Sequence, residues 1–291
     1  MSRRTSSFDV TGKVALVTGG ARGIGFATAE ALARRGALLA IVDLDRDAVE
    51  EAAGHLPGGG ALALAGDVSD RGAMQRAVAT VVERRGGLDI VVANAGIASR
   101  GATVRAMNTE AFDRVLAVNL GGVYNTVLAA VPPIAERSGH IVLISSIYAF
   151  WNGVGTAPYA IAKAGVEQLG RALRVELASH GAGVSVAYFG FIDTEMVHRA
   201  VDADPLSGRL DGLWPRLLHK RLPPRDAGEA VARAVETRAP RIIVPRRWAV
   251  LSAVRGILGP LLDDYMVGDE DMQALVRELD SRADEEQPLT A

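Results

Sequence analysis

Tyr159 and Lys163 stand four residues apart in the stretch Tyr-Ala-Ile-Ala-Lys, a spacing that puts both side chains on one face of a helix. A tyrosine with an ordinary pKa of about 10 is a poor base at neutral pH, but a neighbouring ammonium group favours the phenolate and lowers that pKa. Ser146 follows the apolar run 140–145, where its hydroxyl can bind a carbonyl or alcohol oxygen. These three residues predict acid–base chemistry on such an oxygen. Tyr-x-x-x-Lys alone also occurs by chance in many helices, and Ser145 and Ser146 can simply end a strand.

A glycine-rich stretch near the N-terminus predicts a nucleotide site. It reads Thr-Gly-Gly-Ala-Arg-Gly-Ile-Gly over residues 18–25, between an apolar run and a helical pattern. Glycines let the backbone approach a pyrophosphate, and the start of the following helix offers free N–H groups and a partial positive charge. Asp43 follows Gly25 by 18 residues, near the distance at which a carboxylate binds the adenosine ribose. Asp43 can also be a helix cap, but the glycine loop favours the ribose.

The elements that must hold these residues alternate along the chain. Apolar runs predict strands at 14–18, 38–43, 61–65, 88–93, 140–145, 184–188 and 241–244. Helical patterns lie at 23–35, 45–55, 70–84, 109–135, 158–179 and 226–238. This alternation of continuous apolar strands with helices predicts an α/β fold, a doubly wound, Rossmann-like parallel sheet covered on both faces. We expect a flexible tail over 1–8, one catalytic domain over 9–245 and a C-terminal helical extension over 246–291.

Composition excludes several other classes of function. The 291 residues are 49% apolar and carry a net charge of −2, which is ordinary globular composition without the basic footprint of a nucleic-acid partner. Because the chain has no cysteine and its five histidines are scattered, we expect no metal site. The first residues lack the apolar segment of a secretory signal, and no run reaches the roughly 18 apolar residues of a spanning helix. A cytoplasmic location is the resulting expectation.

In this order and on these elements, the motifs resemble those of the short-chain dehydrogenase/reductase family, with the glycine spacing of its compact subgroup. The likeness covers residues 9 to about 245. It implies hydride exchange between a nicotinamide cofactor and an alcohol or ketone. Ser146 stands 13 residues before Tyr159, the usual spacing in that family, and is therefore preferred to Ser145. The implied catalytic residues are Ser146, Tyr159, Lys163 and Asn119, the last resembling the family's structural and proton-relay asparagine.

The resemblance also implies which residues bind the cofactor. Asp67-Val68 resembles the family's adenine-contacting pair, Asn94-Ala95-Gly96 its Asn-Ala-Gly motif, and residues 190–194 the segment that holds the nicotinamide carboxamide. The implied cofactor site comprises Gly19, Arg22, Gly23, Ile24, Gly25, Asp43, Asp67, Val68, Asn94, Ala95, Gly96, Tyr159, Lys163, Gly190, Ile192 and Thr194. NAD is favoured because the Asp43 carboxylate repels a 2′-phosphate, while Arg22 and Arg46 keep NADP as the alternative.

Two departures and two alternatives remain. Phe189 stands where the family usually has proline, and the sequence after residue 244 lacks its glycine-rich ending, which weakens any inference of a tetramer. The chain could instead be a catalytically silent nicotinamide-binding sensor or scaffold, although such proteins can dispense with Tyr159, Lys163 or Ser146. A Rossmann-like methyltransferase would not need the tyrosine and lysine one turn apart.

Apolar residues favour a bulky or apolar alcohol or ketone as the small-molecule substrate, but they can equally pack a lid on the core. They are Phe150, Trp151, Leu206, Leu210, Leu213, Trp214, Leu217 and Leu218, most of them in an irregular, lid-like segment over 195–224. The apolar helices 109–135 and 158–179 imply a homo-oligomer, a dimer or a tetramer.

The extension supports three predictions. We expect residues 246–265 to wall the substrate pocket, with peripheral membrane contact as the second choice because acidic residues follow. We expect Gly259-Pro260 to kink or end any helix there, and residues 280–291 to be disordered.

Overall fold

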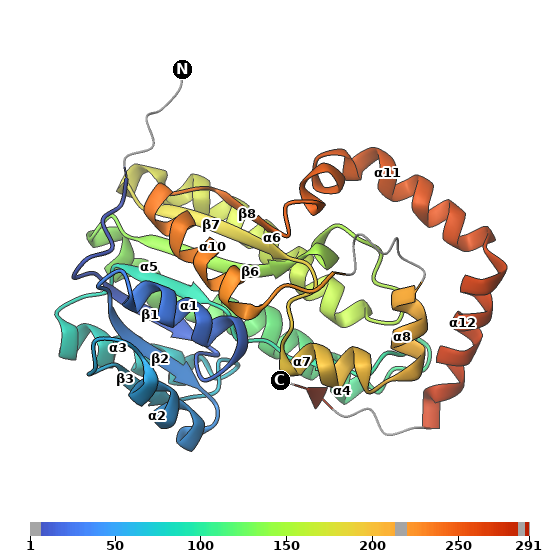
Figure 1. The fold of residues 1–291 in the computed structure, drawn as a ribbon, viewed down its shortest axis with the longest axis horizontal. Coiled ribbons are helices and arrows are strands. Elements are labelled where there is room, and N and C mark those ends of the chain that lie inside the picture. The colour runs from blue at the N-terminus through green and yellow to red at the C-terminus, as the bar shows by residue number, and fades with distance from the viewer. Residues whose placement is uncertain (1–6, 213–219, 285–288, 291) are drawn as a thin grey trace.

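The computed structural model describes residues 7–212, 220–284 and 289–290, and it centres on one sheet of seven parallel strands (Figure 1). The strands are β1 (Val14–Thr18), β2 (Leu38–Asp43), β3 (Leu62–Ala65), β4 (Ile90–Ala93), β6 (His140–Ser146), β7 (Gly183–Phe189) and β8 (Arg241–Val244). Their order across the sheet is β3-β2-β1-β4-β6-β7-β8. The predicted doubly wound sheet is confirmed, and its order reverses between β1 and β4, where such sheets bind ligands.

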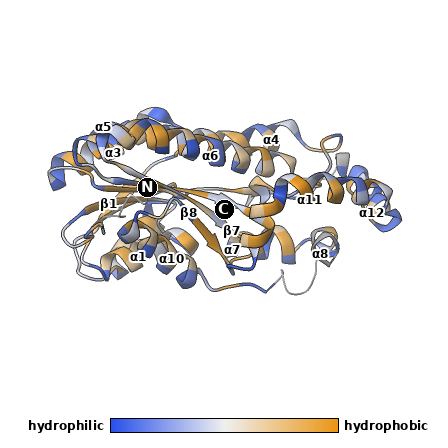
Figure 2. Ribbon diagram, turned by 90° about the horizontal axis from the view of Figure 1, so that it is seen from above, coloured by the Kyte–Doolittle hydropathy of each residue, from blue (hydrophilic) through white to orange (hydrophobic). Residues whose placement is uncertain are grey.

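Helices cover both faces of the sheet, as Figure 2 shows. One layer consists of α1 (Gly23–Ala33), α2 (Arg46–His55) and α10 (Pro224–Thr237). The other consists of α3 (Arg71–Arg85), α4 (Thr109–Leu116), α5 (Val123–Glu136) and α6 (Ala157–Glu176). In β1 the side chains of Ala15 and Val17 pack toward the first layer, and those of Val14 and Leu16 toward the second. Burial on both faces explains why this strand is apolar throughout.

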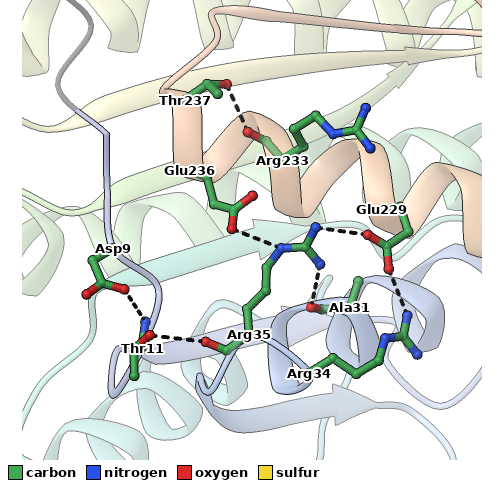
Figure 3. A network of polar contacts seen from close by, with 9 residues as sticks. All are labelled: Asp9, Thr11, Ala31, Arg34, Arg35, Glu229, Arg233, Glu236 and Thr237. Carbon is green, nitrogen blue, oxygen red and sulfur yellow. Dashed lines mark hydrogen bonds and ion pairs between the residues drawn. The ribbon is translucent and has the colours of Figure 1, made fainter.

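α1 and α10 cross closely at a glycine. A β-carbon at Gly228 would lie 2.4 Å from the backbone oxygen of Ala27, so no side chain fits there. At the rim of the same contact, Glu229 accepts from Arg34 at 3.0 Å and from Arg35 at 2.9 Å, while Arg35 also pairs with Glu236 (Figure 3). The glycine sets how near the helices approach, and the ion pairs lie at the half-exposed edge.

The stretch predicted as one helix over 109–135 is divided by a π-helical segment, Ala117–Gly122, between α4 and α5. π-helical turns inside helices are frequent at functional sites, and this one contains Asn119. By length and composition Thr109–Glu136 is the only stretch among the described residues that is apolar enough to cross a membrane. Half of its most apolar window is buried inside the protein, so it packs as a core helix does.

The first part of the segment over 195–224, residues 195–212, is largely helical and not irregular as predicted. It holds α7 (Glu195–Val197), a π-helical turn (His198–Asp202) and α8 (Pro205–Gly212). α8 begins at a proline, and the carboxylate of Asp204 accepts the N–H of Leu206 at 3.1 Å. The aspartate and the proline therefore start a helix here, although a proline- and glycine-rich composition favours a loop. Residues 213–219, and with them Leu213, Trp214, Leu217 and Leu218, lie outside the described residues.

The predicted helical extension is present as α11 (Trp248–Gly268) and α12 (Glu270–Asp280), which arch away from the sheet and return to α8 (Figure 1). Pro260 lies inside α11 and does not end it, because this part of the helix is exposed and water can bond the carbonyl that the proline leaves without a donor. The disorder predicted for 280–291 is wrong for two parts. Residues Ser281–Asp284 form a 3-10 turn, and β9 (Leu289–Thr290) pairs antiparallel with β5 (Ala98–Ser99).

Candidate active site

A cavity of about 250 Å³ opens at the carboxyl edge of the sheet, where β1 and β4 diverge. It is lined by residues that the sequence had singled out from seven separate segments of the chain. Among the lining residues are Gly19, Arg22, Gly23, Ile24, Asp43, Asp67, Val68, Asn94, Ala95, Gly96, Ser146, Tyr159, Lys163, Gly190, Ile192 and Thr194. Gly25 and Asn119 belong to the predicted set but do not line the cavity, and each supports its wall from behind.

The glycine loop requires that two of its positions, Gly19 and Gly25, have no side chain. Gly19 has a φ of 62°, and a β-carbon there would lie 2.9 Å from the Cα of Ala95. A β-carbon at Gly25 would lie 1.9 Å from the oxygen of Gly19, so Gly25 closes the loop against itself. Asn94 fixes the loop by donating to the backbone oxygens of Thr18 at 2.9 Å and Gly19 at 3.1 Å. The loop fits a nucleotide, because its backbone N–H groups can approach a phosphate closely where side chains would otherwise fill the cavity.

Asp43 ends β2 at the mouth of the cavity. Its carboxylate accepts the N–H of Ala21 at 3.0 Å and that of Leu44 at 2.8 Å, which holds it toward the glycine loop. The cap of α2 is Asp45, not Asp43, because the Asp45 side chain accepts the N–H groups of Asp47 and Ala48. The helix-cap alternative for Asp43 is therefore wrong.

The two arginines that kept NADP open are engaged elsewhere. Arg22 reaches across the cavity to Glu195, with 3.3 Å between its Nη1 and the carboxylate. Arg46 is exposed and lies 3.8 Å from Glu50 on the same helix. Neither guanidinium stands free beside Asp43.

Asp67 lies in the cavity beside Arg114, a lining residue that was not predicted from the sequence. Burial opposes its ionisation, but hydrogen bonds from Ser69 and Arg114 outweigh burial and hold the pKa of Asp67 below its ordinary value. Arg114 donates to Asp67 at 2.9 Å and itself lines the cavity. It stands in α4 without any motif, so only its place in the fold identifies it.

Lys163 is buried beneath Tyr159. Its Nζ donates to the backbone oxygen of Ile144 at 3.0 Å and lies 5.4 Å from the centre of the Tyr159 ring. Burial lowers the pKa of Lys163 to about 8. The predicted helix face is therefore confirmed, since the two side chains meet on one face of α6.

Burial raises the pKa of Tyr159, and a hydrogen bond with Ser146 opposes that rise without cancelling it. The lowering predicted from Lys163 is not what this geometry yields. The lysine lies under the ring and bonds to Ile144, so its ammonium does not touch the phenol oxygen. In this arrangement the Tyr159 phenol stays protonated at neutral pH.

The two serines at the end of β6 have different neighbours. The hydroxyl of Ser145 donates to the backbone oxygen of Lys163 at 2.8 Å, which ties the strand to α6. The hydroxyl of Ser146 donates weakly to Phe189 at 3.3 Å. Both serines line the first cavity, but only Ser146 also lines the second cavity described below, beside Tyr159. This difference supports Ser146 as the residue facing substrate.

Asn119 is fully buried, and both ends of its amide bond to one residue. Its Oδ1 accepts the N–H of Ile97 at 2.7 Å, and its Nδ2 donates to the oxygen of Ile97 at 2.8 Å. A β-carbon at Gly96 would lie 3.1 Å from that Oδ1. Both polar atoms of the Asn119 side chain are therefore engaged in this structural contact.

A second cavity of about 140 Å³ joins the first at Ser146, Tyr159, Gly190, Met196 and Val197. Among the described residues, its remaining walls carry no charged side chain. They are Ala98, Ser99, Gly101, Ile147, Tyr148, Thr156, Phe191, Ala200 and Val201. Most of these residues are small or apolar and follow no motif, which is why the sequence did not reveal them.

The predicted pocket wall over 246–265 is wrong, since none of the described residues lining either cavity lies there. Trp248 instead packs behind the second cavity with Phe191 and Ile147, and its indole would meet a β-carbon at Gly190 at 2.6 Å. Phe150 and Trp151 do not line the cavities either. They pack on Tyr188 and on Trp248.

No group of three or more potential metal ligands occurs within residues 7–212, 220–284 and 289–290. The site consists of a cleft at the glycine loop, a tyrosine over a buried lysine and a serine hydroxyl beside the tyrosine. The second, apolar cavity adjoins the tyrosine and the serine. These parts can bind a dinucleotide and exchange a proton with the oxygen of a small neutral molecule.

Residues 13–205 match the family model for short chain dehydrogenases. A relative in Mycobacterium tuberculosis, the probable oxidoreductase EphD, is 35% identical over 252 residues, which is 82% of this chain and 42% of that protein. This chain thus spans about two fifths of that relative. The 3-oxoacyl-[acyl-carrier-protein] reductase FabG of Thermotoga maritima is 38% identical over 193 residues, 65% of this chain and 77% of that protein.

Solved structures agree with this likeness. A short-chain type dehydrogenase/reductase from Mycobacterium marinum superposes with a TM-score of 0.73 at 28% identity, covering 81% of this chain and 95% of that one. Levodione reductase gives a TM-score of 0.73 at 26% identity, and the superposition covers 82% of this chain and 98% of that one.

Proposed function

This chain belongs to the short-chain dehydrogenase family of nicotinamide-dependent oxidoreductases, and we propose that it interconverts an apolar alcohol and its ketone with NAD as the preferred cofactor. The observation that carries the proposal is the place of Tyr159. It stands where the nucleotide cleft meets the apolar chamber, with Ser146 at its side and Lys163 beneath it.

The proton chemistry follows from these positions. When bound, a nicotinamide nucleotide supplies or accepts the hydride at the carbinol carbon. In reduction, Tyr159 donates its phenolic proton to the carbonyl oxygen, while the hydroxyl of Ser146 orients that oxygen. In oxidation, Tyr159 must first lose its proton, a step that burial of the phenol opposes. A raised Tyr159 pKa makes the proton donor the resting form, which favours reduction at neutral pH.

The preference for NAD rests on charge. The Asp43 carboxylate, held at the cavity mouth, suits a ribose hydroxyl and repels a phosphate. Arg22, the cation best placed to counter it, is paired with Glu195.

The apolar preference rests on the second cavity. The described residues of its walls are small, aliphatic or aromatic apart from a few hydroxyls, so a charged substrate would lose its hydration there without a charged partner among them. A volume of about 140 Å³ suits a compact neutral ketone.

Replacing Tyr159 by Phe tests the function, because it keeps the ring and removes the proton. We expect kcat to fall by about 10²- to 10⁴-fold, the usual contribution of positioned acid–base catalysis. Nucleotide fluorescence should show that NADH still binds. The assay uses a panel of neutral alcohols and ketones with both nucleotides, and turnover that is unchanged in the variant would overturn the assignment.

A further inference from the structure

We propose that Arg282, at the end of the C-terminal extension, is a positioning residue that sets the shape of the substrate cavity by joining two of its walls. The proposal rests on the function above only in taking the second cavity as the substrate site. None of the motifs in the sequence points to Arg282.

The Arg282 guanidinium is buried, with 4% of the side chain exposed, and so is its partner Asp204, also at 4%. Its Nη1 lies 2.6 Å from one carboxylate oxygen of Asp204, and its Nη2 bonds the other oxygen, which makes the pair bidentate. The same Nη1 donates to the backbone oxygen of Gly101 at 2.7 Å. One side chain thus connects two segments that are far apart in the sequence.

Both of these segments line the cavity. Gly101 is a lining residue, and it follows β5, whose residues Ala98 and Ser99 line the cavity too. Asp204 lies two residues after the π-helical turn His198–Asp202, which contributes Ala200 and Val201 to the cavity lining. Arg282 therefore fixes the separation of the two walls.

The extension is attached to the same region at further points. Asp280 bonds the hydroxyl of Thr103 and lies 3.6 Å from Arg105. β9 pairs with β5. α12 packs on α8, and its buried residues are Met272, Leu275 and Leu279. Figure 1 shows α12 returning beside α8 after the arch of α11. The guanidinium is thus held from both directions along the chain.

A buried bidentate ion pair holds two segments only in a narrow range of geometries. Removing both ions from water is costly, so the pair is poor evidence for added stability, but its planar fork tolerates little change in geometry. Substrate turnover needs the reacting atoms placed to within a fraction of an ångström. We infer that the pair contributes to substrate positioning more than to the free energy of unfolding.

The principal test is Arg282→Met, which keeps an unbranched apolar side chain and removes the charge and the donors. With acetophenone as the neutral ketone probe, we expect KM to rise by about ten- to a hundredfold, while the Kd for NADH stays within about twofold of wild type. Arg282→Lys retains the charge but not the fork, and should give an intermediate KM.

A second variant separates positioning from stability. Arg282→Met alone leaves the buried Asp204 carboxylate unpaired and should lower the Tm. Combining it with Asp204→Asn removes both charges and keeps an oxygen for the N–H of Leu206. We expect this double variant to recover most of the Tm and to retain the raised KM. If KM recovers together with the Tm, the pair is merely structural and the proposal is wrong.

Arg209 provides the matched control. It pairs with Glu278 and also joins α8 to α12, but both side chains are about half exposed. Arg209→Met should leave KM within about twofold of wild type, because an exposed pair contributes little. An equal effect from both arginines would overturn a special role for Arg282.

Hydrogen exchange tests the geometry without any turnover. The amides of Ala203 and Asp204 bond to His198 and Val201 in the wall that Arg282 holds. In Arg282→Met they should exchange faster, while the amides of α1 stay unchanged. Unchanged exchange at Ala203 and Asp204 would refute the clamp. A wild-type protein that turns over no alcohol or ketone would instead refute the proposed function and leave this measurement valid.

Discussion

At the scale of single residues, the choice of nucleotide depends on one carboxylate and one occupied guanidinium. Replacing Asp43 by Ser removes the charge that opposes a 2′-phosphate and keeps a hydroxyl near Ala21 and Leu44. We expect the ratio of kcat/KM for NAD to that for NADP to fall by on the order of tenfold or more, measured by steady-state kinetics.

The neighbouring cations supply the controls for this prediction. Arg46→Ser should leave the ratio unchanged, because Arg46 is exposed and paired along its own helix with Glu50. Glu195→Gln should shift the ratio toward NADP, since it releases Arg22 at the cavity. A strong wild-type preference for NADP would show that Arg22 leaves Glu195 and outweighs Asp43.

His140 is a residue outside the active site whose burial predicts a response to acid. It is fully buried, its Nε2 lies 2.7 Å from the hydroxyl of Ser185, and that hydroxyl donates to the oxygen of Ala239. The serine therefore accepts from Nε2, and the ring is neutral. Burial lowers the pKa of His140 to about 3 from an ordinary 6.5.

The sign of the effect follows from this shift. Between pH 6.5 and about 3 the unfolded chain binds a proton at His140 that the folded chain does not, so unfolding becomes easier as the pH falls through 6.5. We expect a loss of about 2 kcal/mol in the free energy of unfolding by pH 5. Denaturant melts at pH 7 and pH 5 measure it, and His140→Gln should flatten the difference. An equal pH dependence in that variant would contradict the assignment.

At the scale of elements, the crossing of α1 and α10 depends on the missing side chain of Gly228. Gly228→Ala would push a methyl group into the backbone of Ala27 and Thr28, and the helices would have to separate. We expect the free energy of unfolding to fall by about 1 to 3 kcal/mol, the usual cost of overpacking.

Gly54 is the matched control for that substitution. It also lies in a helix, α2, but a β-carbon there would meet nothing within 4 Å. Gly54→Ala should therefore stabilise the protein by roughly 0.5 to 1 kcal/mol, because alanine loses less backbone entropy in a helix. Denaturant melts of both variants should move in opposite directions, and a shared sign would show that helix propensity, not contact, decides.

At the scale of the whole molecule, the outer face of the helical layer predicts self-association. Tyr124 and Leu128 stand one turn apart on α5, each a little over 40% exposed, and Ile161 on α6 is 50% exposed. Large apolar side chains gathered on one layer typically mark an interface. We expect light scattering to give at least twice the 30.5 kDa of the chain at micromolar concentration.

A charge on that face should weaken the dimer. Leu128→Arg should shift the mass toward a single chain, while Val250→Arg, on the exposed face of α11, should leave it unchanged. A wild-type mass near 30.5 kDa would contradict the prediction, and a dimer that only the α11 variant disrupts would move the interface to the extension.

Much of the catalytic apparatus was predictable because it depends on local geometry. Tyr159 and Lys163 share a helix face whatever the rest of the chain does. The glycines of residues 18–25 allow a backbone that almost no other residue permits. The alternation of apolar strands and helices leads to the order of the sheet, since right-handed crossovers leave few other arrangements.

The tertiary structure alone decided the contacts between distant segments. Asp204 and Arg282 are 78 residues apart, Asp67 and Arg114 are 47 apart, and no periodicity links either pair. Whether a charged side chain meets a partner depends on the path of the backbone between them, which local propensity does not encode. The sequence alone predicted that a tyrosine, a lysine and a glycine loop belong to one site, because local geometry fixes each of them. Only the folded chain decided which residues line the second cavity and which arginine joins its walls.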